Sequence, residues 1–115
     1  LPRARDRAEL RRHALKLRFW PKGPDESEGE LFDLDWSWIK SLPRLRIGEL
    51  RIHDTIGGCD NLRIMFFDPK IAGEPLPTIW VVSVLQQKRD DFTRAQVANF
   101  KTRRKLILER FYSNP

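Results

Sequence analysis

Residues 49–112 contain three strand-like segments in succession: ELRIHDT (49–55), NLRIMFFD (61–68) and TIWVVSVLQQKR (78–89). In the first segment Leu50 and Ile52 alternate with Arg51 and His53, which is typical of a strand with one buried face. The segment IGGCD (56–60) follows it and predicts a tight turn, because glycine tolerates a positive φ. The first two segments therefore predict a β-hairpin.

The second and third segments differ in how their apolar residues are distributed. The second carries Arg63 within an apolar pattern, on the face opposite Ile64. In the simplest hairpin register, Arg51, His53 and Arg63 share one surface. Residues 79–85 are apolar on both faces, which predicts a central strand covered on both sides.

A helix start follows the third strand. Thr93 is the expected N-cap, Gln96 would complete a capping box, and Phe92 and Val97 are placed as a hydrophobic staple. The helix should extend to about Tyr112. It carries one acid, Glu109, and six bases: Arg94, Lys101, Arg103, Arg104, Lys105 and Arg110.

The first third of the chain is organised by charge. Residues 1–14 form a basic exposed helix or a mobile arm, and residues 15–115 form a single domain. The alternation in residues 15–19 predicts a half-buried strand. Residues 25–35 are an acidic surface loop that could also shield a basic face. Asp35 would cap a short helix from Trp36 to Ser41.

Bulk properties narrow the class of protein. The 115 residues are 40% hydrophobic and include four Trp, enough for a modest core, which argues against global disorder. The net charge of +6 favours acidic partners, chiefly nucleic acid or an acidic protein. Many small basic domains nevertheless bind no nucleic acid. Cys59 is the single cysteine, so no disulfide forms within the chain, no Cys/His zinc spacing exists, and a reducing cytoplasm fits best. No apolar run approaches the ~20 residues that cross a bilayer.

The order of segments resembles the RelE/ParE toxin superfamily, in particular its HigB-like and phage-derived branches. The motifs that carry the resemblance lie within residues 44–112: Gly48-Glu-Leu-Arg51, Asn61-Leu-Arg63-Ile-Met-Phe-Phe, Trp80-Val-Val-Ser-Val-Leu and Lys88-Arg89. The resemblance implies an α+β fold, a small twisted antiparallel sheet with helices packed on one face. It also implies the element order strand, helix, three strands and basic helix.

The resemblance implies a function as well. RelE-like members are toxins of type II toxin–antitoxin systems that cleave mRNA in the ribosome, without a metal or small-molecule cofactor, and are held inactive by a cognate antitoxin. ParE-like members inhibit DNA gyrase without cutting. A third interpretation is a plain nucleic-acid-binding module that uses the basic helix and arm. None of the three involves a membrane.

The candidate catalytic residues are Arg51, His53, Arg63, Lys88, Arg89 and Asp90. By resemblance Arg51 and Arg63 contact RNA, where they could stabilise a phosphorane, and Lys88 and Arg89 form the basic cluster after the last long strand. His53 could act as base or acid. Asp90, Asp91 and Phe92 stand where some members have tyrosine or histidine, so Asp90 or Asp91 could substitute in proton transfer, as acidic residues do in some HigB-like members.

Structural interpretations of the same residues remain open. Arg51 could pair with Glu49 or Asp54, Arg63 could pair with Asp60 or Asp68, and a lone strand histidine is often structural. The helix cations span more than one face and are expected to be mostly solvated, although they could bind rRNA phosphates by charge: Lys101, Arg103, Arg104 and Lys105.

Overall fold

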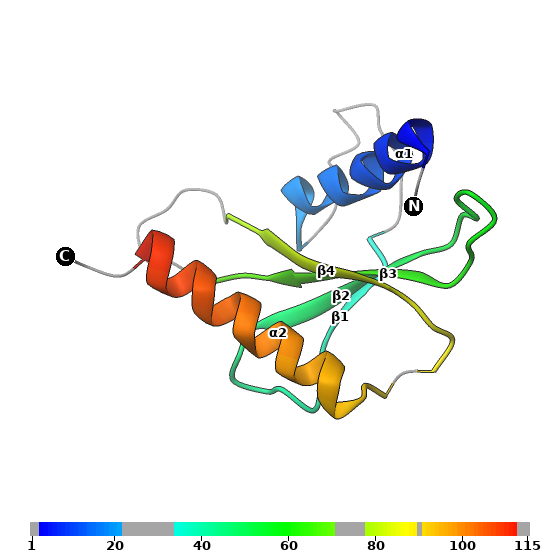
Figure 1. Cartoon of the computed structure of the whole chain (residues 1–115). Coiled ribbons are helices and arrows are strands. Elements are labelled where there is room, and N and C mark those ends of the chain that lie inside the picture. Colours follow the sequence, from blue (N-terminus) through cyan, green and yellow to red (C-terminus); the bar gives the residue numbers. More distant parts are fainter. Residues whose placement is uncertain (1–2, 22–33, 71–77, 90, 113–115) are drawn as a thin grey trace.

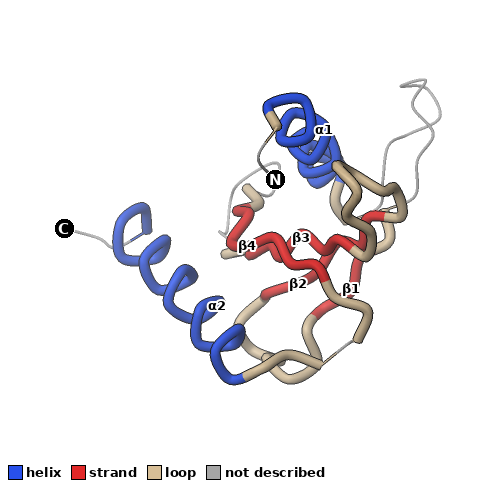
Figure 2. The backbone as a smooth tube through the Cα atoms, turned by 45° about the vertical axis from the view of Figure 1, so that its right-hand side comes forward, coloured by secondary structure: helices blue, strands red, loops and turns tan. Residues whose placement is uncertain are grey.

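The computed structural model describes residues 3–21, 34–70, 78–89 and 91–112. Within them, four antiparallel strands form one sheet in chain order: β1 (Trp36–Trp38), β2 (Ile47–Ile52), β3 (Leu62–Phe67) and β4 (Trp80–Gln86). One face carries α1 (Ala4–Ala14) and the 3₁₀ helix η1 (Leu15–Phe19), and the other carries α2 (Arg94–Ile107), which continues as the π-helical η3 (Leu108–Tyr112) (Figures 1 and 2). The predicted α+β class with a small antiparallel sheet is confirmed.

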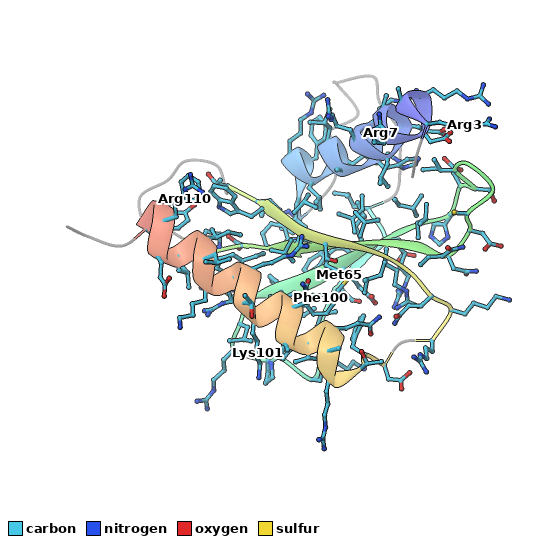
Figure 3. The ribbon with its side chains drawn as sticks, in the orientation of Figure 1. Arg3, Arg7, Met65, Phe100, Lys101 and Arg110 are labelled. Carbon is cyan, nitrogen blue, oxygen red and sulfur yellow. The ribbon has the colours of Figure 1, made fainter. Side chains whose placement is uncertain are left out.

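Two apolar clusters, one on each face, hold the helices to the sheet. Under α1 and η1, Leu17 packs with the side chains of β2 and β3, including the fully buried Ile64 and Phe66. Under α2, Phe100 packs with Met65, as Figure 3 shows. Both side chains, like that of Ile64 on the opposite face, are inaccessible to solvent. β2 and β3 are the two inner strands of the sheet, and β3 is buried at every position.

The predicted hairpin is confirmed, with the register assumed from the sequence. Arg51 lies opposite Arg63, and Leu50 lies opposite Ile64. At the turn, Gly57 and Gly58 have φ values of 59° and 79°, in the left-handed region that glycine adopts without steric cost. The hairpin therefore places both strand arginines on the α2 side of the sheet.

The predicted start of the C-terminal helix is also confirmed. Thr93 Oγ1 accepts the Gln96 backbone N–H at 3.1 Å, and Gln96 Oε1 accepts the Thr93 backbone N–H at 2.9 Å. Phe92 and Val97 both pack against the cluster beneath α2. A reciprocal cap of this kind satisfies two of the backbone donors that a helix start leaves unpaired.

Two predictions in the first third of the chain are wrong. Residues 15–19 form η1 rather than a strand, because they continue α1 directly and the helical turn buries Leu17 while leaving Leu15 55% exposed. Residues 36–38 form β1 rather than a capped helix. Pairing with β2 places Trp36 and Trp38 within 5–6 Å of Trp20, between ring centroids, in an aromatic cluster that a helix would have split.

The predicted place of β4 and the implied layering also need correction. β4 is an edge strand of the described sheet, with Val82 buried under α2 but Val81 47% and Val84 40% exposed on the opposite face. Helices cover both faces of the sheet, so the one-sided arrangement implied by the resemblance is wrong. The implied element order is wrong as well. The chain begins with α1 and η1, ahead of all four strands.

Two further expectations concern membranes and the acidic loop. Among the described residues, none of the helices combines the length and the apolar character that a membrane crossing requires. Most of the acidic segment 25–35 lies outside the described residues, so only Leu34 and Asp35 at its end are placed.

Candidate functional site

A buried carboxylate joins the two strand arginines. Glu49 Oε2 accepts a hydrogen bond from Arg63 Nη1 at 2.9 Å, and Glu49 Oε1 accepts one from Arg51 Nη2 at 3.0 Å. The side chains of Glu49 and Arg63 are 5% and 7% exposed, whereas that of Arg51 is 36% exposed. Two like charges opposite each other on adjacent strands repel, and Glu49 offsets that repulsion because it contacts both.

Arg63 is therefore part of the interior. Its second amino group, Nη2, donates to the backbone carbonyl of Lys88 at 3.0 Å, so one guanidinium connects β2 to the turn after β4. The prediction that Arg63 belongs to the same face as Arg51 is confirmed, but its partner is Glu49 rather than Asp60 or Asp68. Arg51 is left as the strand arginine that reaches solvent.

His53 and Arg51 share a second carboxylate, Asp35. Asp35 Oδ2 lies 2.8 Å from His53 Nε2, and Asp35 Oδ1 lies 3.5 Å from Arg51 Nη1. Since a carboxylate only accepts, the neutral ring carries its hydrogen on Nε2 and keeps a lone pair on Nδ1. The His53 side chain is 74% exposed, so the imidazole is oriented by Asp35 yet open to solvent.

The turn that carries Lys88 and Arg89 is fixed through its backbone. Gln87 Nε2 donates to the carbonyls of Arg89 and Asp91 at 3.0 Å each, and the Gln87 backbone N–H donates to the Asn61 carbonyl at 3.1 Å. Lys88 and Arg89 are exposed, with Arg89 Nε 4.0 Å from Asp91. Asp90 lies outside the described residues, so its predicted role has no structural counterpart.

Two hollows meet at Arg51. The larger is about 460 Å³ and is lined by residues of β1, β2 and the loops beside them: Ser37, Trp38, Ile39, Lys40, Ser41, Glu49, Arg51, Asp91 and Phe92. The smaller is about 90 Å³ and brings Arg51 together with His53, Arg63 and Gln87. Arg51 is shared by a hollow that contains the Glu49 carboxylate and one that contains the His53 imidazole, an arrangement able to bind a polar ligand.

The predicted cations of α2 divide into two pairs. Arg103 Nη1 donates to the Val82 carbonyl of β4 at 2.6 Å, and Arg104 Nε donates to the Leu45 carbonyl, in the loop between β1 and β2, at 3.0 Å. Lys101 is exposed, and Lys105 Nζ lies 3.8 Å from Glu109 one helical turn away. The expectation of mostly solvated cations therefore holds for the exposed Lys101, Arg103 and Lys105, whereas Arg104 is half-buried, and both arginines also donate to backbone carbonyls.

Sequence reasoning missed the acidic half of the site. The sequence predicts Glu49 only as a possible partner of Arg51, and it predicts Asp35 only as a helix cap. The signal for Glu49 was its spacing: two residues before Arg51 it shares that residue's face, one diagonal step from Arg63. Asp35, Ser37 and Lys40 depend on where β1 pairs, which no local pattern indicates.

Comparison of the chain with protein-family models, with curated proteins and with solved structures finds no match. The function is therefore inferred from the residues of the site.

Proposed function

We propose that the chain is the toxin of a type II toxin–antitoxin pair and that it cleaves mRNA on the ribosome at the site around Arg51. The observation that best supports this function is the position of Arg51 itself. Its guanidinium donates to Glu49, and its side chain lines both hollows. Asp35 pairs with both Arg51 and the exposed imidazole of His53. A guanidinium held in place beside an imidazole is suited to a phosphodiester.

The proposed chemistry uses the 2′-hydroxyl of the RNA as nucleophile. The 2′-oxygen attacks phosphorus while His53 Nδ1 takes its proton, and Asp35 stabilises the imidazolium through Nε2. Arg51 donates to the phosphorane oxygens, where negative charge develops. The bond from phosphorus to the 5′-oxygen breaks, that oxygen takes a proton from water, and the imidazolium of His53 returns its proton to the solvent. The products are a 2′,3′-cyclic phosphate and a 5′-hydroxyl end.

The remaining exposed cations supply binding. Lys40 lines the larger hollow, and Lys88 and Arg89 stand exposed on the turn after β4. Contacts from such side chains to phosphates carry no sequence information, so they position the mRNA without selecting it. Binding through them should weaken steeply with salt. A cognate antitoxin would act by covering this surface.

One observation favours a second function, the inhibition of a protein target without cleavage. Two strand arginines on the RNA are what the family resemblance implies, and here Arg63 is committed to Glu49 and to the Lys88 carbonyl. A member with a single accessible strand arginine fits a binding inhibitor as well as it fits a nuclease.

Induced expression with mapping of mRNA 5′ ends separates these functions. The wild-type chain should create new ends within translated codons minutes after induction, and Arg51→Ala should abolish them. Arg51 is the better probe than Arg63 because it is partly exposed and its loss leaves no buried charge inside the sheet.

A double variant, Lys101→Ala with Lys105→Ala, serves as the matched control. It removes two positive charges from α2 without breaking the hydrogen bonds of Arg103 and Arg104 to the carbonyls of Val82 and Leu45. The nuclease predicts that this variant still cuts. Growth arrest without cuts would support the binding inhibitor, and a defect greater in the lysine variant than in Arg51→Ala would support a plain nucleic-acid-binding module.

A further inference from the structure

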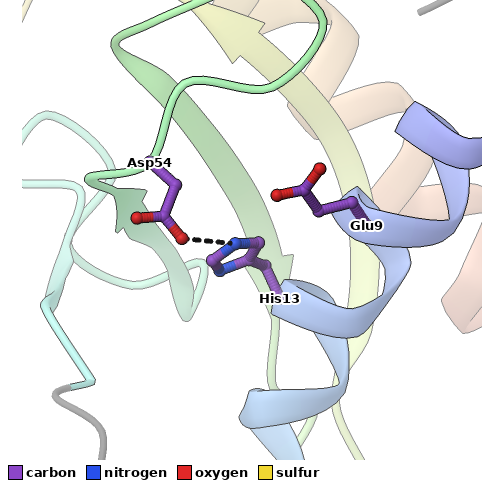
Figure 4. A group of neighbouring side chains, drawn as sticks. All are labelled: Glu9, His13 and Asp54. Carbon is purple, nitrogen blue, oxygen red and sulfur yellow. Dashed lines mark ion pairs between the residues drawn. The ribbon is translucent and has the colours of Figure 1, made fainter.

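Three potential metal ligands converge on the side of the molecule that carries α1. Glu9 and His13 project from successive turns of α1, and Asp54 follows β2 (Figure 4). His13 Nε2 lies 3.2 Å from Asp54 Oδ2, and one ligand atom from each of the three residues lies within 4.8 Å of the others. Glu9 and His13 are four residues apart, the spacing that puts two side chains on one helix face.

The distances fit a small transition-metal ion. In a tetrahedron with metal–ligand bonds of about 2.0 Å, ligand atoms lie about 3.3 Å apart, close to the 3.2 Å between His13 and Asp54. Glu9 can close the remaining gap because its side chain has rotatable bonds. One imidazole and two carboxylates are a ligand set that Zn²⁺ accepts, with a fourth position left for water.

Burial and exposure are divided as a binding site requires. The His13 side chain is 12% exposed, which holds the imidazole in one orientation, whereas Asp54 is 66% exposed and leaves a path for an ion from solvent. The described groups that face His13 also include cations, namely Arg12 on α1 and Lys16 on η1. These cations lower the affinity for a metal, so the site is expected to be of moderate strength.

Lys16 also fixes the state of the ring. Lys16 Nζ lies 3.0 Å from His13 Nδ1, and since an ammonium only donates, Nδ1 accepts and the ring hydrogen is on Nε2. A metal ion would need the Nε2 lone pair. Binding therefore moves the hydrogen to Nδ1 and displaces Lys16, which makes Lys16 a competitor of the metal.

We propose that Glu9, His13 and Asp54 form a Zn²⁺ site that ties α1 to the β2–β3 hairpin. This site lies on the α1 side of the sheet, apart from the two hollows that Arg51 lines, and it does not depend on the function proposed above. Because α1 and the hairpin meet across it, the ion would act as a cross-link between them and raise the stability of the folded chain.

The test is a calorimetric titration of the full chain, free of any histidine tag, with Zn²⁺ at pH 7.5. A Cys59→Ser background removes the one thiol that could bind zinc elsewhere. One ion per chain is expected, and Asp54→Asn and His13→Ala should each weaken binding at least about tenfold. Co²⁺ should give the visible absorption of a tetrahedral site, and the melting temperature should rise with Zn²⁺.

Two variants make the result specific. His53→Ala removes the second histidine of the chain, which is also paired with a carboxylate, and it should leave the affinity unchanged. Lys16→Met removes the competitor and should tighten binding. Absence of binding, or equal affinities for the parent and Asp54→Asn, would overturn the proposal. Asp54 is exposed, so a circular dichroism spectrum matching the parent ensures that lost binding is not unfolding.

Discussion

Arg51 and Arg63 lie directly opposite each other on β2 and β3, and each donates to a different oxygen of Glu49. The pairing gives two identical side chains different tasks. Arg63 is enclosed and joins the hairpin to the turn after β4, while Arg51 stands at the surface with its guanidinium held from one side. Substitution of Arg63 should therefore affect mainly stability, and substitution of Arg51 mainly activity.

Arg63→Ala should destabilise the fold strongly. The substitution leaves the Glu49 carboxylate, which is 5% exposed, without its most buried partner. It also removes the hydrogen bond that Arg63 donates to the Lys88 carbonyl. Breaking a buried ion pair by removing one partner typically costs about 3–5 kcal/mol. Arg51→Ala removes a partly exposed partner and should cost less than about 1 kcal/mol. Urea denaturation of the two variants measures both values.

Replacement of both buried partners provides the control. Glu49→Met combined with Arg63→Met leaves no uncompensated charge and should recover much of the stability lost in Arg63→Ala. Equal stability of Arg63→Ala and Arg51→Ala would show that the buried ion pair of Arg63 with Glu49 does not stabilise the fold.

Gly48→Ala should destabilise β2. A Cβ at this position would lie 2.5 Å from Cζ of Phe66, a fully buried ring packed among Trp20, Trp36 and Trp38. Inserting a methyl group into such a packed site costs about 1–3 kcal/mol. The measurement is the melting temperature.

Gly58→Ala is the comparison for that experiment. Its φ of +79° strains any other residue, but no described atom outside its neighbours comes within 4 Å of the added Cβ. It should therefore cost only the backbone strain of about 1 kcal/mol. A Gly48→Ala variant as stable as the parent would rule out the close approach of Phe66.

Arg104→Ala should be the most damaging substitution among the four predicted helix cations. Its Nε caps the Leu45 carbonyl, and its guanidinium lies 5.2 Å from the centroid of the Phe67 ring. Loss of a charged hydrogen bond and a cation–π contact should lower the free energy of unfolding by about 1–3 kcal/mol. Lys101→Ala, at an exposed position, should stay within about 0.5 kcal/mol. Denaturant unfolding distinguishes the two, and equal effects would contradict the capping role.

Stability should fall as the pH drops below 6.5 because of His13. Burial, and then the nearby Lys16 ammonium, lower the pKa of His13 below its usual 6.5, against the opposing pull of Asp54 and Glu9. The unfolded chain then binds more protons than the folded one in this window, so acid favours unfolding. The lost stability begins near pH 6.5 and is complete below the lowered pKa.

The measurement is the urea midpoint from pH 8 to pH 5 in the presence of EDTA, for the parent and for His13→Gln. Because every other ionisable group is common to the two proteins, only the difference between the two curves reports His13. A difference that does not change across pH 6.5 would contradict the lowered pKa.

The hairpin and the capped helix could be predicted because their signals are local. The alternation around Arg51 and Arg63 and the two turn glycines fix the register, and Thr93 and Gln96 fix the helix start. Each of these patterns involves residues that contact one another within a few positions or across one turn. Such contacts form in nearly any tertiary setting.

Pairing between distant segments could not be predicted. The predicted strand at residues 15–19 is a helical turn because α1 continues into it. The predicted helix at residues 36–38 is a strand because it pairs with β2. Local propensity is a weak guide to structure where such contacts form. The edge position of β4 has the same origin, since an apolar strand does not show how many neighbours it has. The pairs of Asp35 with Arg51 and His53 exist only once β1 is in place.

The proposed cleavage of RNA at Arg51 is tested by incubating purified ribosomes, programmed with a defined mRNA, with the chain and determining the chemistry of both new ends. We expect cuts that leave a 2′,3′-cyclic phosphate and a 5′-hydroxyl. These cuts should be lost in Arg51→Ala and reduced in His53→Ala, while both variants keep the parent's circular dichroism spectrum. Intact mRNA with the wild-type chain, or equal cutting by Arg51→Ala, would contradict it.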